Sequence, residues 1–204
     1  MFSPLMKGVM RFSSNDPELG IEIHGHVILD GSSLAVIDPP MLPGLDSYLK
    51  VLGKPEGVIL TNYHHARGSL VLAGRLGTQL YVPKLQAANE ASNREKFMGC
   101  TEYGESTKLP LGILAHHLRA GIEGNPLIYE EMILQHGTLL AAGDSAWGKD
   151  GGIEFFPAGI FPDPENRMSG SIRKSFGAFV RETGADSLIS GHREFIRNGL
   201  SKLF

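Results

Sequence analysis

The chain has 204 residues, 42% of them hydrophobic and 20% charged, and this size and composition are typical of a single globular domain, which we expect to cover residues 1–204. Its 19 basic and 22 acidic side chains give a formal charge of −3, which argues against a nucleic-acid partner that is bound through its phosphates. The sequence has no apolar run of 18 residues, no secretory signal pattern and one cysteine, so we expect no membrane span, no internal disulfide and a cytoplasmic location.

Strand and turn signals open the chain. Residues 20–30 alternate apolar and polar side chains up to Asp30-Gly31, and residues 33–38 continue as a second strand, so the pair predicts a β-hairpin. Apolar spacing predicts a helix over residues 45–52, and residues 70–76 also have a helical pattern. Residues 84–98 are polar and rich in Ala, Glu and Lys, which predicts a surface helix. Short apolar runs predict buried strands over residues 57–61 and 79–82.

The second half of the chain has the same mixed pattern. Apolar runs predict strands over residues 111–118, 127–135, 138–142 and 187–190, the middle two as a hairpin. Helical spacing predicts helices over residues 168–183 and 195–204, and the Gly, Pro and Phe content of residues 150–164 predicts a loop. With 26 glycines and 12 prolines for tight turns, the sequence indicates an α+β or mixed α/β fold with at least two sheets.

Three of the predicted strands end in side chains that can bind metal or transfer protons. They are followed by Asn62-Tyr63-His64-His65, by Gly143-Asp144 and by Gly191-His192. Sites in α/β sheets lie at the carboxyl ends of strands, so three such endings predict one polar cluster. Histidine nitrogen and aspartate oxygen are common ligands of zinc and other divalent ions.

The order of these elements resembles the metallo-β-lactamase superfamily. Its members carry an opening hairpin, a strand followed by His-x-His-x-Asp-His, a later Gly-Asp after a strand, and a Gly-His before the last helix. The resemblance covers about residues 20–203 and is carried by the segments Ala35–Pro39, Gly57–Thr61, Leu139–Asp144 and Ile189–His192. It implies a four-layer αββα sandwich in which two packed β-sheets are flanked by helices.

The metal motif of that superfamily is incomplete in this chain. In the window from Asn62 to Arg67 only His64 matches, because Asn62 replaces the first histidine, Ala66 the aspartate and Arg67 the last histidine. A further histidine is expected before Gly-Asp. Either His116 or His117 supplies it, or it is absent because residues 118–121 match the approach to that position, and the second interpretation is slightly favoured.

The resemblance implies a metal-dependent hydrolase with at most one ion. Asp144, His64 and His192 would be the catalytic residues and the metal ligands, with His117 as a fourth ligand. Three protein ligands and an open position are enough for catalytic zinc, and iron or manganese would suit the same donors. The substrate, an unknown small molecule, would be an ester, thioester, amide or phosphoester.

A catalytically inactive, metal-free relative is the alternative. Arg67 would place a fixed positive charge beside Asp144, where a second cation is lost. Asn62 and His65 would line the former active-site pocket with it. Such a pocket would bind a small anionic ligand or a protein partner.

Other candidate residues are expected to have structural roles. His24 and His26 alternate on one strand, and we expect them at the strand surface rather than as ligands. Cys100 has no activating neighbour in sequence, so it is not a predicted nucleophile. A homodimer is expected if one apolar patch is exposed, made of Phe155, Phe156, Ile160 and Phe161.

Overall fold

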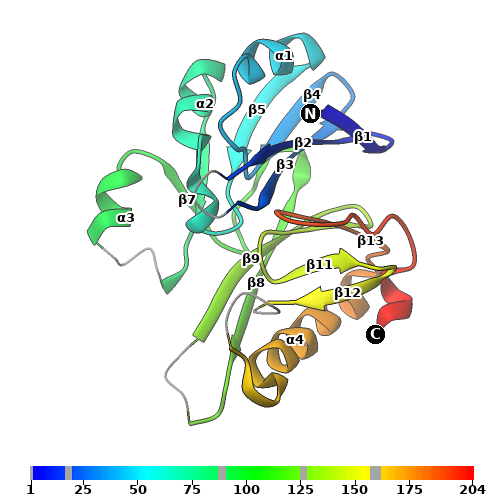
Figure 1. The fold of residues 1–204 in the computed structure, drawn as a ribbon. Helices are drawn as coiled ribbons and strands as arrows, with labels where there is room; N and C mark the ends of the chain where they lie inside the picture. Colours follow the sequence, from blue (N-terminus) through cyan, green and yellow to red (C-terminus); the bar gives the residue numbers. More distant parts are fainter. Residues whose placement is uncertain (1, 17–19, 87–90, 125–127, 157–161) are drawn as a thin grey trace.

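The computed structural model describes residues 2–16, 20–86, 91–124, 128–156 and 162–204. Two β-sheets face each other at its centre (Figure 1). Helices α1 (Leu45–Leu52) and α2 (Ser69–Leu76) cover the outer face of one sheet, and α4 (Arg167–Thr183) covers the outer face of the other. The four-layer αββα sandwich predicted from the sequence is therefore confirmed. Among the described residues no helix is long and apolar enough to cross a membrane.

The first sheet contains seven strands that follow one another in chain order. They are β1 (Phe2–Met6), β2 (Val9–Asn15), β3 (Glu22–Asp30), β4 (Ser33–Ile37), β5 (Lys54–Ile59), β6 (Leu80–Pro83) and β7 (Thr101–Tyr103). Strands β1 to β4 pair antiparallel, and β4 to β7 pair parallel, with the short helix α3 (Ala91–Lys96) before β7. The parallel pairing brings the carboxyl ends of β4 and β5 to one edge of this sheet.

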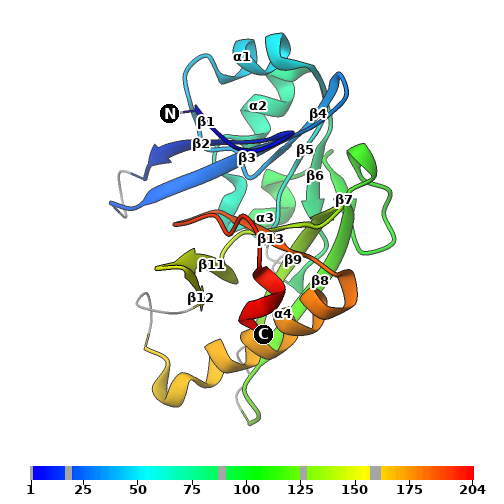
Figure 2. The ribbon, with the colours of Figure 1, turned by 90° about the vertical axis from the view of Figure 1, so that its right-hand side faces the viewer.

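The second sheet has the strand order β13-β10-β9-β8. Its members are β8 (Leu114–Gly121), β9 (Ile128–His136), β10 (Leu139–Ala142) and β13 (Ser187–Ser190). Strands β10 and β13 are parallel, with Ala142 opposite Ser190, so the residues that follow these two strands begin side by side. Strands β11 (Ala146–Lys149) and β12 (Gly152–Phe155) form a separate hairpin beside α4 (Figure 2).

Alternation of side chains along β5 shows how the layers are held together. Val58 points toward α1 and α2 and joins a buried cluster with Leu49 and Leu72. Ile59 points to the other face and joins the cluster between the sheets with Met132. Helix α4 closes the far side through one apolar face formed by Met168, Ile172, Phe176 and Val180. A period of two in the strand and of 3.6 in the helix thus builds three apolar interlayers.

Most predicted elements are present, with differences at elements whose limits depend on tertiary contacts. The β1–β2 hairpin was not predicted, because pairing with β3 stabilises it rather than its own weak alternation. The helix expected over residues 195–204 is only a 3₁₀ turn (Leu200–Leu203), since Gly199 adopts a left-handed φ of 83°. Of the helix expected over residues 84–98 the structure shows α3, and residues 87–90 lie outside the described residues.

The apolar patch expected to support a dimer is only partly described. Phe155 is 5% exposed and packs against Phe176 and Phe204, so it belongs to the core. Phe156 is half-buried against Tyr129. Ile160 and Phe161 lie outside the described residues. The homodimer therefore remains a prediction.

Candidate metal centre

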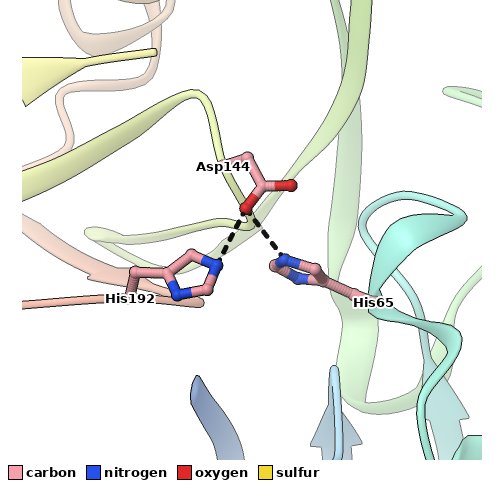
Figure 3. A group of neighbouring side chains, drawn as sticks. All are labelled: His65, Asp144 and His192. Carbon is pink, nitrogen blue, oxygen red and sulfur yellow. Dashed lines mark hydrogen bonds and ion pairs between the residues drawn. The ribbon is translucent and has the colours of Figure 1, made fainter. Parts of the chain in front are cut away.

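Three polar side chains converge where β5, β10 and β13 end (Figure 3). His65 lies in a 3₁₀ turn (His64–Ala66) after β5, Asp144 lies two residues beyond β10, and His192 lies two residues beyond β13. One donor atom from each of these residues lies within 4.8 Å of the other two. Two elements of the second sheet and one of the first therefore contribute to a single cluster.

Both histidines point the same nitrogen at one carboxylate oxygen. His65 Nε2 is 3.0 Å from Asp144 Oδ1, and His192 Nε2 is 3.1 Å from the same atom. The two imidazole rings are nearly perpendicular, with an interplanar angle of 74° and 5.6 Å between centroids. The His65 side chain is buried, whereas His192 and Asp144 remain 16% and 20% exposed, so the cluster opens to solvent on their side.

The other nitrogen of each histidine is fixed by an acceptor. His65 Nδ1 lies 2.8 Å from Asp38 Oδ2, and Asp38 also accepts from the Thr61 amide and hydroxyl at 2.8 and 2.6 Å. His192 Nδ1 lies 3.2 Å from the carbonyl oxygen of Glu22. Because these acceptors have no proton to give, each Nδ1 donates, and Nε2 is the atom left to bind a ligand.

This arrangement fits a single divalent ion. Bonds of about 2.0–2.2 Å at tetrahedral angles place two ligand atoms about 3.3–3.5 Å apart. The two nitrogen–oxygen separations, 3.0 and 3.1 Å, are close to that value. A metal-binding imidazole usually donates its other ring N–H to an acceptor, as the Nδ1 atoms of both histidines do here. His65, Asp144 and His192 could therefore hold a metal while leaving a position open for substrate.

Without a metal the same residues form a chain of alternating charges. Burial lowers the pKa of His65, but Asp144 and Asp38 on its two sides outweigh burial and raise it to about 10. Burial raises the pKa of Asp144, but the His65 charge and the hydrogen bond from His192 hold it well below its usual range. A metal must therefore displace a proton from His65 in order to bind.

A buried carboxylate fixes the backbone at Asp144. Glu131 of β9 is 0% exposed, and its Oε1 accepts from the Asp144 amide at 2.8 Å and from Asn62 Nδ2 at 3.1 Å. Its Oε2 accepts from the Ser145 amide at 3.0 Å. Burial and the nearby Asp144 charge raise the pKa of Glu131. Its contacts connect the turn after β5 to the turn after β10.

Two glycines allow the chain segments of the site to approach. A Cβ atom on Gly191 would overlap the His65 ring, and a Cβ atom on Gly143 would overlap Glu131 Oε1 and Thr61 Oγ1. The Gly-Asp and Gly-His pairs that the sequence shows after β10 and β13 therefore have a steric cause. Glycine gives the backbone room, and the next residue gives the polar side chain.

The structure places the expected ligand His64 outside the cluster. His64 is exposed, and its neighbour His65 is the buried residue that contacts Asp144. In a 3₁₀ turn consecutive side chains point about 120° apart, so only one of the pair can face the site. Asp144 and His192 do lie together, as the argument from strand ends predicts.

His117, the fourth expected ligand, is also elsewhere. It lies within β8, where its Nε2 is 3.5 Å from Glu130 Oε1, and it is not part of the cluster. The alternation along β8 puts His117 on the sheet face that it shares with Met132, where it lies beside Glu130 and not at the ends of β10 and β13. His116 on the same strand bonds Gln135 at 2.8 Å.

Asn62 contacts the cluster directly, whereas Arg67, expected beside Asp144, acts on it through its charge and makes its hydrogen bond elsewhere. Asn62 Nδ2 donates to Asp144 Oδ2 at 3.1 Å, and Asn62 Oδ1 accepts from the His65 amide at 3.0 Å. Arg67 is half-buried and donates from Nη1 to the His24 carbonyl at 3.1 Å. Burial lowers the pKa of Arg67, while Asp38 and Asp144 act in the opposite direction.

Sequence reasoning missed several polar residues around the cluster. His24 and His26 are 1% and 2% exposed, so the expected surface position is wrong, because the turn after β13 covers this end of β3. Asp38 follows β4 directly, and the same strand-end signal could have identified it. Glu131 had no such signal, since it lies inside a strand among apolar neighbours.

Comparison with known proteins gives likeness in structure and none in sequence. No protein-family model matches the chain, and no curated protein sequence matches it. A crystal structure of the DIM-1 metallo-β-lactamase exposed to ceftazidime has a TM-score of 0.70 and 15% identity, covering 100% of this chain and 92% of that one. The metallo-β-lactamase from Pontibacter korlensis has a TM-score of 0.71 and 14% identity, with coverage of 100% and 94%.

A third solved structure adds a single-metal example. The metallo-β-lactamase FIM-1 from Pseudomonas aeruginosa, in its mono-zinc form, has a TM-score of 0.65 and 11% identity, covering 100% of this chain and 92% of that one. At such identities the comparison shows a common fold over the full chain and leaves activity open.

Proposed function

We propose that this chain, which has the metallo-β-lactamase fold, is a hydrolase that uses one divalent metal ion held by His65, Asp144 and His192. One observation carries the proposal. The Nε2 atoms of both histidines meet at one carboxylate oxygen, while each Nδ1 is held by an acceptor behind it. Metal-binding histidines ordinarily have their other ring nitrogen held by a carboxylate or a backbone carbonyl in this way.

Some residues of the site would bind the ion, and others hold the ligands in place. His65, Asp144 and His192 would bind the ion, and Asp38 keeps the His65 ring in place through its 2.8 Å contact with Nδ1. When bound, a divalent ion supplies a Lewis acid that polarises a carbonyl or phosphoryl oxygen and lowers the pKa of water. Substrate would enter on the partly exposed side of Asp144 and His192. Because the neighbours are named β-lactamases, a β-lactam amide is the first substrate to test, beside esters, thioesters and phosphoesters.

A metal-free binding protein is the second candidate, and the contact of Asn62 favours it. The Asn62 amide occupies Asp144 Oδ2, so one oxygen of the central carboxylate already has a partner within the chain. His65, charged between two carboxylates, satisfies the other oxygen. Such a pocket would bind a small anion or a protein partner near Arg67.

Metal content separates the two candidates. The purified chain would be analysed by elemental mass spectrometry, as isolated and after incubation with Zn²⁺, Mn²⁺ or Fe²⁺ and removal of free ion. We expect about one ion per chain, lost in His65→Ala and Asp144→Ala. His64→Ala is the matched control, since His64 is the adjacent histidine but is exposed. No ion under any condition, or loss in His64→Ala alone, would overturn the proposal.

A further inference from the structure

The turn that carries His192 is bonded to the beginning of β3. In the views of Figures 1 and 2 the segment after β13 passes under the β2–β3 hairpin. The His24 amide donates to the Gly191 carbonyl at 2.8 Å, and His24 Nε2 lies 3.0 Å from the Arg193 carbonyl. His24 therefore holds both residues that flank His192: its backbone amide binds Gly191, and its side chain binds Arg193.

We propose that His24 is a positioning residue that keeps His192 Nε2 directed at the metal site. The inference rests on the proposed function, because it concerns how a ligand of that site is oriented. The His192 ring is itself held at Nδ1 by the carbonyl of Glu22, which precedes His24 by two residues in β3. The start of β3 thus fixes the backbone on both sides of His192 and also the far side of its ring.

The hydrogen bonds of His24 define its tautomer. The Arg193 carbonyl can only accept, so His24 Nε2 must carry the proton. In a neutral ring Nδ1 then accepts, and the Ser13 hydroxyl, 2.9 Å away, donates to it. Burial, followed by the charge of Arg11, lowers the pKa of His24 to about 4, which agrees with a neutral ring. Ser13 therefore selects the form of His24 that can hold Arg193.

A second donor reaches the same carbonyl. Arg11 Nη1 of β2 donates to the Arg193 oxygen at 3.0 Å, so this oxygen accepts from two buried or half-buried side chains. Arg193 has a φ of 57°, in the left-handed region that a non-glycine residue occupies at a cost. The two hydrogen bonds stabilise that conformation, and the turn it forms sets the direction of His192.

The test compares variants of residues in β2 and β3 by metal affinity and by a spectrum of the site. His24→Ala removes the contact with Arg193, His24→Gln keeps an amide donor on a side chain of similar reach, and Ser13→Ala removes the hydroxyl that fixes the tautomer. Ile23→Ala is the matched control, because Ile23 is also buried in β3 but points to its opposite face. Zn²⁺ affinity would be measured by chelator competition, and the site by absorption of the Co²⁺-substituted protein.

We expect His24→Ala to weaken Zn²⁺ binding by about 10–100-fold, the usual effect of losing a residue that orients a metal ligand, and to shift the Co²⁺ absorption bands. His24→Gln should restore most of the affinity, Ser13→Ala should lie between, and Ile23→Ala should lower stability without changing either reading. Equal affinity and an unchanged spectrum in folded His24→Ala would overturn the inference, as would an equal loss in Ile23→Ala.

A second measurement separates this inference from the proposed function. If the wild-type chain binds no metal, the proposed function fails, but the orientation of His192 can still be read by ¹⁵N NMR of its imidazole in the metal-free protein. We expect the imidazole ¹⁵N shifts of His192 to be the same in the wild type and in Ile23→Ala, and to change in His24→Ala, where the contact of Nδ1 with the Glu22 carbonyl is disturbed. An unchanged His192 signal in His24→Ala would overturn the positioning role whether or not metal binds.

Discussion

The two sides of the candidate site are built differently. On the side of the first sheet, the turn from Asn62 to Arg67 contributes side chains that reach the cluster through hydrogen bonds. On the side of the second sheet, Gly143 and Gly191 bring the backbone itself against the first side, and only then do Asp144 and His192 add polar groups.

This difference predicts which residues of the site can be substituted and which cannot. A hydrogen bond from a side chain has substitutes, since an amide, an imidazole or a guanidinium can donate to the same oxygen. A backbone in contact with a ring has none, because any Cβ atom occupies the space of its neighbour. The second side should therefore tolerate change less than the first, and substitutions on each side test this.

The largest effect is expected at Glu131, which joins the two sides. Glu131→Ala leaves the amides of Asp144 and Ser145 without their acceptor and removes one of the two acceptors of Asn62 Nδ2. Each buried donor left unsatisfied costs about 1–3 kcal/mol, so we expect a loss of about 3–5 kcal/mol of unfolding free energy, measured by urea denaturation.

The conservative variant sharpens this result. Glu131→Gln can keep its oxygen at the Oε1 position, which serves Asp144 and Asn62, and loses only the Ser145 contact at Oε2. We expect it to cost about 1–3 kcal/mol, less than Glu131→Ala. Equal losses for the two variants would mean that packing volume, and not the acceptor oxygens, explains the role of Glu131.

A glycine pair gives the next largest effect and tests the backbone contact directly. Gly191→Ala places a methyl group into the His65 ring, and overpacking of this kind costs about 1–3 kcal/mol. Gly74→Ala, in the interior of α2 with open space around it, should instead stabilise the protein by about 0.5–1 kcal/mol. Thermal unfolding of both variants measures the difference, and two changes of the same sign would contradict the steric account.

Acid should weaken the contact between β3 and the turn of His192. His24 has a pKa lowered from 6.5 to about 4 in the folded state, so the unfolded chain takes up its proton first. Stability from this group is complete above pH 6.5 and is lost as the pH falls toward 4, by about 1–2 kcal/mol in all if solvent screening reduces the full shift.

A variant isolates this contribution from other titrating groups. Burial and the charges of Arg11, Arg67 and His192 lower the pKa of His24, and the Glu22 carboxylate lies 4.0 Å from its Nε2. Glu131, whose pKa is raised, changes stability in the opposite direction with pH. The stability gap between the wild type and His24→Gln should therefore narrow between pH 6.5 and 4. Urea denaturation at pH 7.5, 6, 5 and 4.5 measures the gap, and a constant gap would show that His24 does not titrate as described.

The fold could be predicted from the sequence wherever the signal was local. The hairpin over residues 20–38, the helix over residues 45–52 and the strands before Asp144 and His192 follow from alternation, spacing and turn residues, and all are present. Strands β1 and β7 could not be predicted, because β1 is held by pairing with β2 and β7 by pairing with β6. Tertiary contacts decide such elements.

The metal ligands could be predicted only where a residue lies within two positions of the end of a strand that pairs in register. Asp144 and His192 satisfy this condition, since β10 and β13 are parallel and adjacent. Between β5 and His65 lie five residues, the last of which begins a 3₁₀ turn, so the strand gives no information about which histidine turns inward. Glu131 and His24 act through contacts across the sheets, and a single sequence holds no record of those partners.

The smallest effect is expected from the charge of Arg67. Its positive field lowers the pKa of His65 and would also oppose a bound cation, so Arg67→Gln should tighten Zn²⁺ binding by a few-fold, about 2–10 at low ionic strength. Arg67→Lys keeps the charge but not the planar donor to His24, and Arg75→Gln, in α2, is the control for a charge removed away from the site.

These variants distinguish charge from contact on the first side of the site. One outcome is Zn²⁺ binding that is tighter than in the wild type in Arg67→Gln and unchanged in Arg67→Lys, with a difference that shrinks as the salt concentration rises. That result would show that Arg67 acts as a fixed cation that competes with the metal. Weaker binding in both Arg67→Gln and Arg67→Lys would instead show that its hydrogen bond to the His24 carbonyl matters more, because both variants lose that geometry. In the second case the first side of the site would be as intolerant of exchange as the glycine contacts opposite it.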